Sequence, residues 1–169
     1  MPKTSYAIAL GSNRRHGRHG SPANVIRAAI HDLARRGLAI EAVSNTHLTP
    51  ALGPSGRSFA NAAALLATDL APSELLTCLK EVEQAFGRRG GRRWGARVLD
   101  LDLILWSEGS WGEGDLIIPH PEMRQRRFVL DPLAELVPDW RDPISGATVR
   151  QLRARLSAPT PVDRIAAPS

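Results

Sequence analysis

The sequence contains only one cysteine, Cys78, among its 169 residues. A single thiol cannot form a disulfide within one chain, so the fold must be held together by its core. A chain of this length can bury a sufficient core in one domain. Because disulfides are absent, we expect a reducing compartment, and the cytoplasm is the default location.

Long hydrophobic runs are also missing. Nowhere do about 18 uninterrupted apolar residues occur, which is the length that a membrane-spanning helix requires. The first eight residues contain one lysine and no extended apolar stretch, so they do not resemble a secretory signal. Both absences argue against membrane spanning and secretion.

Lysine is scarce, because Lys3 and Lys80 are the only lysines among 22 basic residues and all the others are arginines. The net charge of +5 and the isoelectric point near 10.6 indicate a polyanionic partner. Arginine favours planar, bidentate recognition of phosphate over attraction by a point charge. Composition alone leaves nucleotides and nucleic acids equally open as partners.

Two common phosphate-binding motifs do not occur: the sequence has no GxxxxGK[ST] and no set of protein-kinase loops. Residues 87–106, GRRGGRRWGARVLDLDLILW, offer a different arrangement. Here Asp100 and Asp102 share one face of a predicted strand, roughly 6.5 to 7 Å apart along it. Five arginines occupy the ten positions 88–97 just before that strand.

This stretch has two interpretations. Two carboxylates side by side can hold a divalent cation, or two cations about 3.5 to 4 Å apart, and with arginines they would form a polyphosphate site. The alternative is an edge strand with two solvated aspartates beside a solvated basic loop. A bare Asp-x-Asp motif is too short to decide between them.

A longer resemblance favours the first interpretation. The string from Arg93 to Asp102, RWGARVLDLD, resembles the RWGPRxLDLD signature of the 6-hydroxymethyl-7,8-dihydropterin pyrophosphokinase family. Members of that family transfer a pyrophosphoryl group from ATP to a pterin alcohol in folate biosynthesis and release AMP. The resemblance spans the chain to about Leu152 and includes Gly11-Ser12-Asn13, 49–54, 59–61, Glu83, 87–88 and 119–128.

The resemblance implies a role for each matching residue. It gives catalytic roles to Arg88, Arg97, Asp100 and Asp102, the two aspartates also binding two Mg²⁺ ions. It places ATP, the co-substrate, at Glu83, Trp94, Leu103, His120 and Arg126, and it implies that Glu83 orients active-site arginines. It assigns the pterin to Thr49, Leu52, Phe59, Asn61 and Phe128. In this scheme Phe59 and Phe128 stack on the ring, and Thr49 and Leu52 act through their backbones.

The chain departs from the family pattern in several places. Phe59 and Pro121 stand where the family usually has tyrosine, and Ala96 replaces a proline. The segment after Gly87 is one residue shorter than in the family, which leaves Arg89 and Arg92 without an assigned role. The basic run at 14–20, RRHGRHG, is interpreted as a solvated surface loop.

Periodicity predicts strands near 5–10, 38–48, 58–67 and 116–118, with a further strand carrying the two aspartates. It predicts helices from Ser21-Pro22 to Gly37, from Pro72 to Gly87 and over 149–156. This order suits an α+β fold. The resemblance sharpens it to a ferredoxin-like antiparallel sheet with helices on its faces, an αβα sandwich. We expect one domain over 1–156 and a mobile tail over 157–169.

A second function class remains to be weighed. Residues 88–97 with Trp94 also resemble an RGG-type stacking segment of a nucleic-acid-binding module. Asp100 and Asp102 discriminate, because two carboxylates repel phosphates unless a metal intervenes. We therefore expect a monomeric enzyme that uses ATP and a pterin alcohol and has no nucleic-acid or membrane partner.

Overall fold

A computed structural model describes residues 2–13, 19–49, 59–89 and 98–157. Five strands form the main sheet, and every pairing between them is antiparallel. The strands are β1 (Thr4–Ser12), β2 (Ala39–Val43), β3 (His47–Thr49), β4 (Phe59–Thr68) and β5 (Asp100–Trp106). Their order is β2-β4-β1-β5, with β3 also paired to β4. With one helix after β1 and one after β4, this is the predicted ferredoxin-like arrangement.

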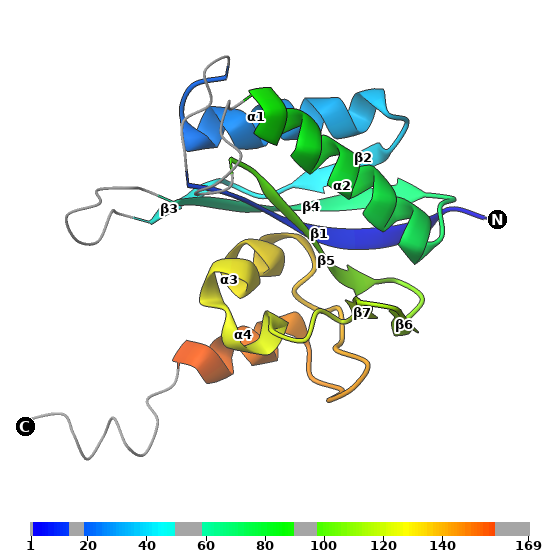
Figure 1. Ribbon diagram of the computed structural model, residues 1–169. Coiled ribbons are helices and arrows are strands. Elements are labelled where there is room, and N and C mark those ends of the chain that lie inside the picture. Colours follow the sequence, from blue (N-terminus) through cyan, green and yellow to red (C-terminus); the bar gives the residue numbers. More distant parts are fainter. Residues whose placement is uncertain (1, 14–18, 50–58, 90–97, 158–169) are drawn as a thin grey trace, which may run out of the picture.

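Helices cover both faces of the sheet (Figure 1). One face carries α1 (Pro22–Arg35) and α2 (Pro72–Arg89), and the other carries α3 (Arg127–Leu136) and α4 (Val149–Ser157). The predicted αβα sandwich is therefore confirmed. None of the described helices combines the length and apolar character needed to cross a bilayer.

Helix α1 forms where the sequence predicts it. The Ser21 hydroxyl caps its first turn by accepting the N–H of Asn24, and Pro22 occupies the first turn, where no N–H is needed. Its apolar positions at helical spacing are buried against the sheet: Val25, Ile26, Ala29 and Leu33. Gly37 then ends the helix with a φ of 93°, which a residue with a side chain rarely adopts.

Strand alternation divides the core into two layers. On β1, Tyr6, Ile8 and Leu10 face α1 and α2, whereas Ala7 and Ala9 face α3. The small side chains on the α3 side leave space at the sheet surface. That space matters for the site described below.

A β-bulge changes this alternation in β5. Pairing with β1 shifts register between Ala7 and Ile8, so Leu103 faces α1 and α2 while both Ile104 and Leu105 face α3. Before the bulge, Asp100 and Asp102 keep the same face as each other, as the sequence predicts.

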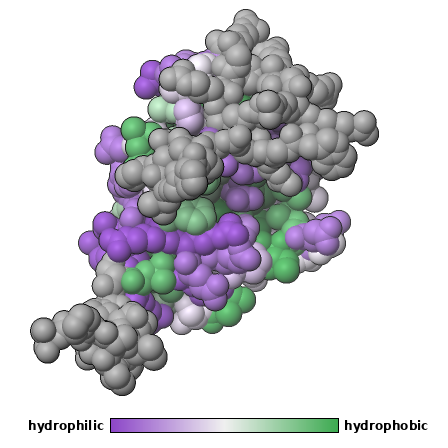
Figure 2. Space-filling view, turned by 60° about the vertical axis from the view of Figure 1, so that its left-hand side comes forward, coloured by the Kyte–Doolittle hydropathy of each residue, from purple (hydrophilic) through white to green (hydrophobic). Residues whose placement is uncertain are grey.

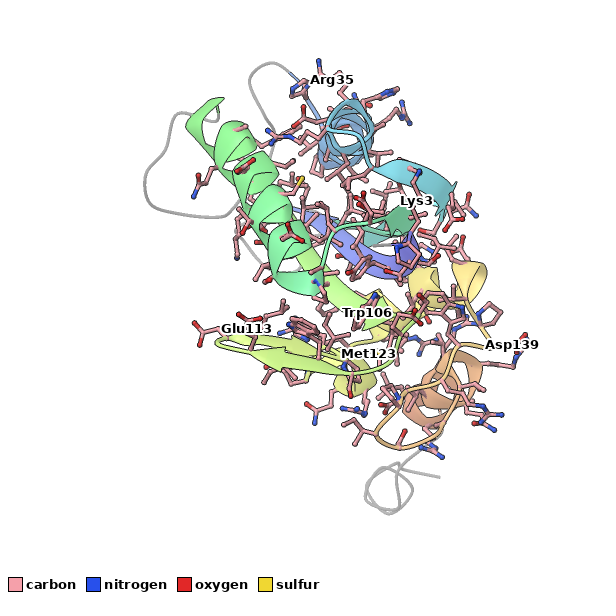
Figure 3. All side chains as sticks on the ribbon, turned by 90° about the vertical axis from the view of Figure 1, so that its right-hand side faces the viewer. Lys3, Arg35, Trp106, Glu113, Met123 and Asp139 are labelled. Atoms are coloured by element: carbon pink, nitrogen blue, oxygen red, sulfur yellow. The ribbon has the colours of Figure 1, made fainter. Side chains whose placement is uncertain are left out.

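A small hairpin of β6 (Trp111–Glu113) and β7 (Leu116–Ile118) follows β5. Trp111 packs edge-on against Trp106 with ring centroids 5.7 Å apart, and Trp106 in turn stacks on Tyr6. In Figure 3, Glu113 lies at the outer end of this hairpin, away from Trp106 and Met123. Met123 belongs to a 3-10 turn, η1 (Met123–Gln125), that leads into α3.

Two predicted elements differ from the structure. The strand expected over 38–48 is divided into β2 and β3 at Ser44, whose N–H donates to the Ala63 carbonyl and whose hydroxyl accepts the Ala63 N–H. Residues 127–136, where the sequence predicts no helix, form α3 with Pro132 inside it. The predicted tail over 157–169 falls almost entirely outside the described residues.

Candidate active site

A pocket of about 710 Å³ opens between the α3 face of the sheet and the start of α3. Its floor is β1 and the residue that follows it, with Ala9, Gly11 and Asn13 in succession along it. Figure 2 brings the β3 side of the molecule forward and shows hydrophobic surface in a hollow bordered by a band of hydrophilic residues. Strand β1 also contributes Leu10 and Ser12 to the lining. The other lining residues come from β3, β4, β5 and the start of α3: Thr49, Phe59, Asn61, Asp100, Asp102, Arg126, Phe128 and Val129.

The register of three strands explains why the polar side chains meet here. Gly11 is paired with Asn61 of β4 on one side and with Asp100 of β5 on the other. Ala9 is paired with Asp102 in the same way. On the middle strand, Gly11 contributes only a hydrogen atom and Ala9 only a methyl group. The side chains of the two neighbouring strands can therefore extend over β1 into the pocket.

Gly11 is needed for this opening. A Cβ atom at this position would lie 3.2 Å from the Asn61 Oδ1 atom. That separation is shorter than the roughly 3.5 Å of an ordinary non-bonded contact. Gly11 therefore sets where the Asn61 amide can lie.

The two carboxylates of β5 are half-buried in the pocket. Within the described residues, no group of three or more His, Cys, Asp and Glu side chains could hold a metal ion. Two carboxylates nevertheless suit Mg²⁺, which is usually bound by one or two carboxylates together with water and substrate phosphates. The donor set fits an ion that arrives with a nucleotide better than a permanent metal.

Although β5 is an edge strand, neighbouring elements cover its outer side. The Leu101 N–H, between the two aspartates, donates to Glu83 Oε2 of α2 at 2.7 Å. Further along, the His120 N–H donates to the Ile104 carbonyl at 3.0 Å. The alternative of two solvated aspartates on a free edge does not describe this strand, because its edge groups are paired and its aspartates line a pocket.

Glu83 is itself largely buried, with 13% of its side chain exposed. Burial raises its pKa, and the nearby charge of Asp100 acts in the same direction. The Leu101 N–H and Lys80, whose Nζ lies 3.5 Å from Oε1, offset only part of this rise. The described contacts make Glu83 a support for the aspartate strand.

His120 does not line the pocket itself, and its ring is neutral. Burial lowers its pKa, and although the charge of Asp102 raises it, that of Arg126 lowers it further. The Nδ1 atom accepts the Glu122 N–H at 3.2 Å. A neutral imidazole that accepts at Nδ1 carries its proton on Nε2, so this atom is left as a donor.

Arg126 is the N-cap residue of α3, and Phe128 lies in the first turn of that helix. The Arg126 guanidinium pairs with Glu122 and lies 5.6 Å from the centre of the Phe128 ring. Phe128 is 48% exposed, so it does not belong to the core. Val129 and Leu130 provide the buried contacts of this turn instead.

Phe59, Asn61 and Thr49 line the other side of the pocket. Thr49 is the cross-strand partner of Phe59, so both side chains lie on one face. Phe59 is 46% exposed despite its size. Two large aromatic rings, one from β4 and one from α3, are thus half-exposed at the same pocket.

Some of the residues assigned from the sequence do not line this pocket. Leu103 is 3% exposed and packs in the α1 and α2 core, so its side chain cannot contact a nucleotide here. Arg88 lies in the last turn of α2, but its side chain is not among those described. Leu52, Trp94 and Arg97 lie outside the described residues, as do Arg92 and Arg93.

Sequence reasoning gave no role to Asn13. Its Oδ1 atom is buried and has no hydrogen-bond partner within the described part of the chain, yet the residue lines the pocket. An acceptor in this position is available to a ligand donor. The signal was present in the sequence, since Asn13 closes a Gly-Ser-Asn turn directly after a buried strand.

Comparisons with known proteins agree on one family. The profile of the family described as 7,8-dihydro-6-hydroxymethylpterin-pyrophosphokinase (HPPK) matches residues 7–138. A 2-amino-4-hydroxy-6-hydroxymethyldihydropteridine pyrophosphokinase of Synechocystis sp. is 42% identical over 153 residues, which cover 90% of this chain and 77% of the relative. A relative with the same name from Methylorubrum extorquens is 37% identical over 160 residues, covering 94% of this chain and 96% of its own.

Among solved structures, the HPPK-DHPS protein of Plasmodium falciparum has a similar fold, with a TM-score of 0.71 and 12% identity. The match covers 90% of this chain and 41% of that longer chain, so it bears on the fold of one part of a fusion protein. The sequence matches extend over most of both chains and carry the assignment. This chain belongs to the 7,8-dihydro-6-hydroxymethylpterin-pyrophosphokinase family.

Proposed function

We propose that the pocket between β1, β4, β5 and the start of α3 binds the pterin at one end and the phosphates of ATP at the other. The chain is a pyrophosphokinase of folate biosynthesis, which transfers a pyrophosphoryl group from ATP to the hydroxymethyl group of 6-hydroxymethyl-7,8-dihydropterin. The observation that carries the proposal is the joint lining of one pocket by two half-buried carboxylates, two half-exposed phenylalanines and a neutral amide.

The carboxylate end suits the transferring group. Asp100 and Asp102 would hold two Mg²⁺ ions, which supply charge neutralisation along the phosphates when bound. Asp102 would also accept the proton of the attacking hydroxymethyl group. The oxygen then forms a bond to the β-phosphorus, the bond from that phosphorus to the α-phosphate oxygen breaks, and AMP leaves with that oxygen.

His120 and Arg126 supply donors on the same side. The proton on His120 Nε2 and the Arg126 guanidinium would donate to phosphate oxygens, and Arg126 would exchange its pairing with Glu122 for the more strongly charged ligand. Arg88 and Arg97 are proposed to stabilise the transferring group, and Trp94 to contact the nucleotide. These three assignments rest on the resemblance alone.

The aromatic end suits a flat heterocycle. Phe59 and Phe128 would stack on the two faces of the pterin, while Asn61 and the backbones of Thr49 and Leu52 would pair with its amide and amidine edge. Neutral hydrogen bonds of this kind are directional, so they identify the ring without a charged side chain. The nucleic-acid alternative finds no support in a pocket lined by two carboxylates.

The test is release of AMP that depends on the pterin alcohol. Asp100→Asn and Asp102→Asn remove a metal-binding charge and should each lower turnover by about 10²-fold or more. Asp115→Asn, at an exposed position in the β6–β7 turn, is the matched control and should keep full activity. Full activity of either β5 variant would refute the assignment.

A further inference from the structure

We propose that Glu135 is a positioning residue for the pterin, because it ties strand β3 to helix α3 and so fixes the spacing between the two aromatic sides of the pocket. This inference rests on the proposed function. Nothing in the sequence motifs points to Glu135, since its partners are 88 and 90 residues earlier in the chain.

The tie consists of two contacts from one carboxylate. Glu135 Oε1 accepts the backbone N–H of Asn45 at 2.9 Å, and Oε2 pairs with Nε2 of His47. Asn45 lies in the short connection from β2 to β3, and His47 is the first residue of β3. The side chains of Glu135 and His47 are 30% and 37% exposed, so the pair is partly shielded from water.

Strand β3 needs such a tie. It is three residues long, pairs only with β4 among the described strands, and exposes 68% of Leu48. A strand of this length contributes few ladder bonds and little buried apolar area. Its position relative to α3 therefore depends on the contacts that Glu135 makes.

The register places the tie next to the pterin residues. His47 is the cross-strand partner of Asn61, and Thr49 is the partner of Phe59. The side chains of His47 and Thr49 share one face of β3. His47, which pairs with Glu135, is therefore adjacent to the residues that would bind the pterin ring. A shift of His47 would move this side of the pocket as a unit.

Helix α3 connects Glu135 to the second aromatic side of the pocket, which carries Phe128. Phe128 and Glu135 are seven residues apart, which is about two helical turns, so they lie on one side of the helix and about 10 Å apart along it. The helix side that presents Phe128 is thus the side tied to β3. The pterin would be held between Phe59 and Phe128, and the contacts of Glu135 would fix the spacing between these two rings.

The electrostatics keep the tie in place at neutral pH. Burial raises the pKa of Glu135, but the hydrogen bonds from the Asn45 N–H and from His47 lower it by more, and the net pKa is below its ordinary value. Glu135 is therefore ionised and accepts from both partners. With Oε2 accepting at Nε2, His47 serves as a donor across the two elements.

The experiment compares Glu135→Ala with Asp131→Ala. Asp131 is one turn earlier on α3 and accepts from Arg127 and Arg153, so its loss removes helix ion pairs without touching β3. Isothermal titration gives the Kd of the pterin in the presence of a nonhydrolysable ATP analogue, and the Kd of the analogue alone. Denaturant unfolding of both variants gives their stability.

Glu135→Ala should raise the pterin Kd about ten-fold, which corresponds to the loss of about one neutral hydrogen bond to the ring, while the analogue Kd changes less than two-fold. Asp131→Ala should leave both Kd values near wild type. Glu135→Gln keeps an acceptor for the Asn45 N–H and should fall between wild type and Glu135→Ala. In a double-mutant cycle, His47→Ala should add little to Glu135→Ala.

The inference is wrong if Glu135→Ala leaves the pterin Kd unchanged, or if it weakens both ligands in proportion to the stability lost. It is also wrong if Asp131→Ala weakens the pterin as much. Should Glu135→Ala fail to fold, Glu135→Gln and His47→Ala make the same comparison. Failure of the wild-type protein to bind the pterin would instead refute the proposed function.

Discussion

At the scale of single residues, the pocket depends on the absence of large side chains from one face of β1. Gly11 and Ala9 leave the floor open, so Asn61, Asp100 and Asp102 can lie over it from the neighbouring strands. This is a property of the strand register and not of any one motif. Small residues in the middle strand are as necessary to the site as the polar residues beside them.

Substitution of Gly11 tests this dependence. Gly11→Ala places a Cβ 3.2 Å from Asn61 Oδ1, so the amide must move by a few tenths of an ångström. We expect pterin affinity to fall about ten-fold, since a displaced hydrogen-bonding group loses its geometry. Gly112→Ala, where an added Cβ has open space, is the control and should bind like wild type. Equal affinity of Gly11→Ala and Gly112→Ala would contradict this role.

Substitution of Asn61 should weaken the binding of the pterin but not that of ATP. Asn61→Ala leaves polar atoms of a buried pterin unpaired, at about 1 to 3 kcal/mol for each lost partner. The pterin Kd should therefore rise by about ten-fold to over a hundred-fold, and that of ATP should stay nearly constant. Calorimetric titration of each ligand measures the two changes in Kd. If both affinities fall equally, Asn61 supports the fold and does not recognise the pterin.

At the scale of elements, β5 is held in place by its neighbours. Glu83 of α2 accepts the Leu101 N–H, and the His120 N–H donates to the Ile104 carbonyl, so the outer edge of the aspartate strand is held at two points. Two residues assigned from the sequence to the nucleotide, Glu83 and His120, thus also position the aspartate strand.

Two variants of Glu83 distinguish its roles. Glu83→Ala removes the acceptor of a buried N–H and should lower the free energy of unfolding by about 1 to 3 kcal/mol, with a fall in kcat of about ten-fold. Glu83→Gln keeps an acceptor, so its free energy of unfolding and its kcat should both stay close to those of the wild type. Glu81→Ala, at an exposed position on the same helix, is the control. If Glu83→Gln is as inactive as Glu83→Ala, the charge of Glu83 is what matters, as expected for an orienter of arginines.

Local sequence patterns predicted most elements but not their contacts. The alternation around Asp100 and Asp102 and the Ser21-Pro22 start of α1 both reflect local physics, and the structure follows them. The β5 bulge and the break at Ser44 could not be predicted, because each depends on a partner strand. Helix α3 was missed as a helix because Pro132 interrupts its pattern, and the tie from Glu135 to His47 leaves no trace in local sequence.

At the scale of the whole molecule, one buried ion pair joins the site to the C-terminal part. Asp142 is fully buried and accepts two hydrogen bonds from Arg124, at 2.5 and 2.7 Å, together with those of Ser145 Oγ and the Ile144 N–H. Arg124 belongs to η1, two residues before Arg126. The pair therefore fixes the turn from which α3 and its pocket residues begin.

This pair predicts the response to acid. The hydrogen bonds from Arg124 hold the pKa of Asp142 well below its ordinary value of 3.8. The folded state therefore binds this proton less readily than the unfolded chain, so the stabilisation is complete above about pH 5 and is lost as the pH falls further. Asp142→Asn should lower the free energy of unfolding at pH 7 by about 3 kcal/mol, at the low end for a broken buried pair because Arg124 is 30% exposed.

Urea unfolding of both proteins at a series of pH values measures this effect. The difference between wild type and Asp142→Asn should be constant from pH 7 to about pH 5 and should shrink toward pH 3. Asp139→Asn removes an exposed pairing with Arg150 and should show neither the loss nor the pH dependence. A difference that stays the same at pH 3 would assign the effect to packing instead of charge.

The central claim is that one pocket holds both substrates, with the metal at the β5 end and the pterin between two rings. A crystal structure of the complex with the pterin, a nonhydrolysable ATP analogue and Mn²⁺ in place of Mg²⁺ tests it most directly, because anomalous scattering locates the metal. We expect metal peaks within coordination distance of Asp100 and Asp102, and the pterin ring between Phe59 and Phe128 with its edge on Asn61. Metal bound away from both aspartates, or a pterin outside this pocket, would contradict it.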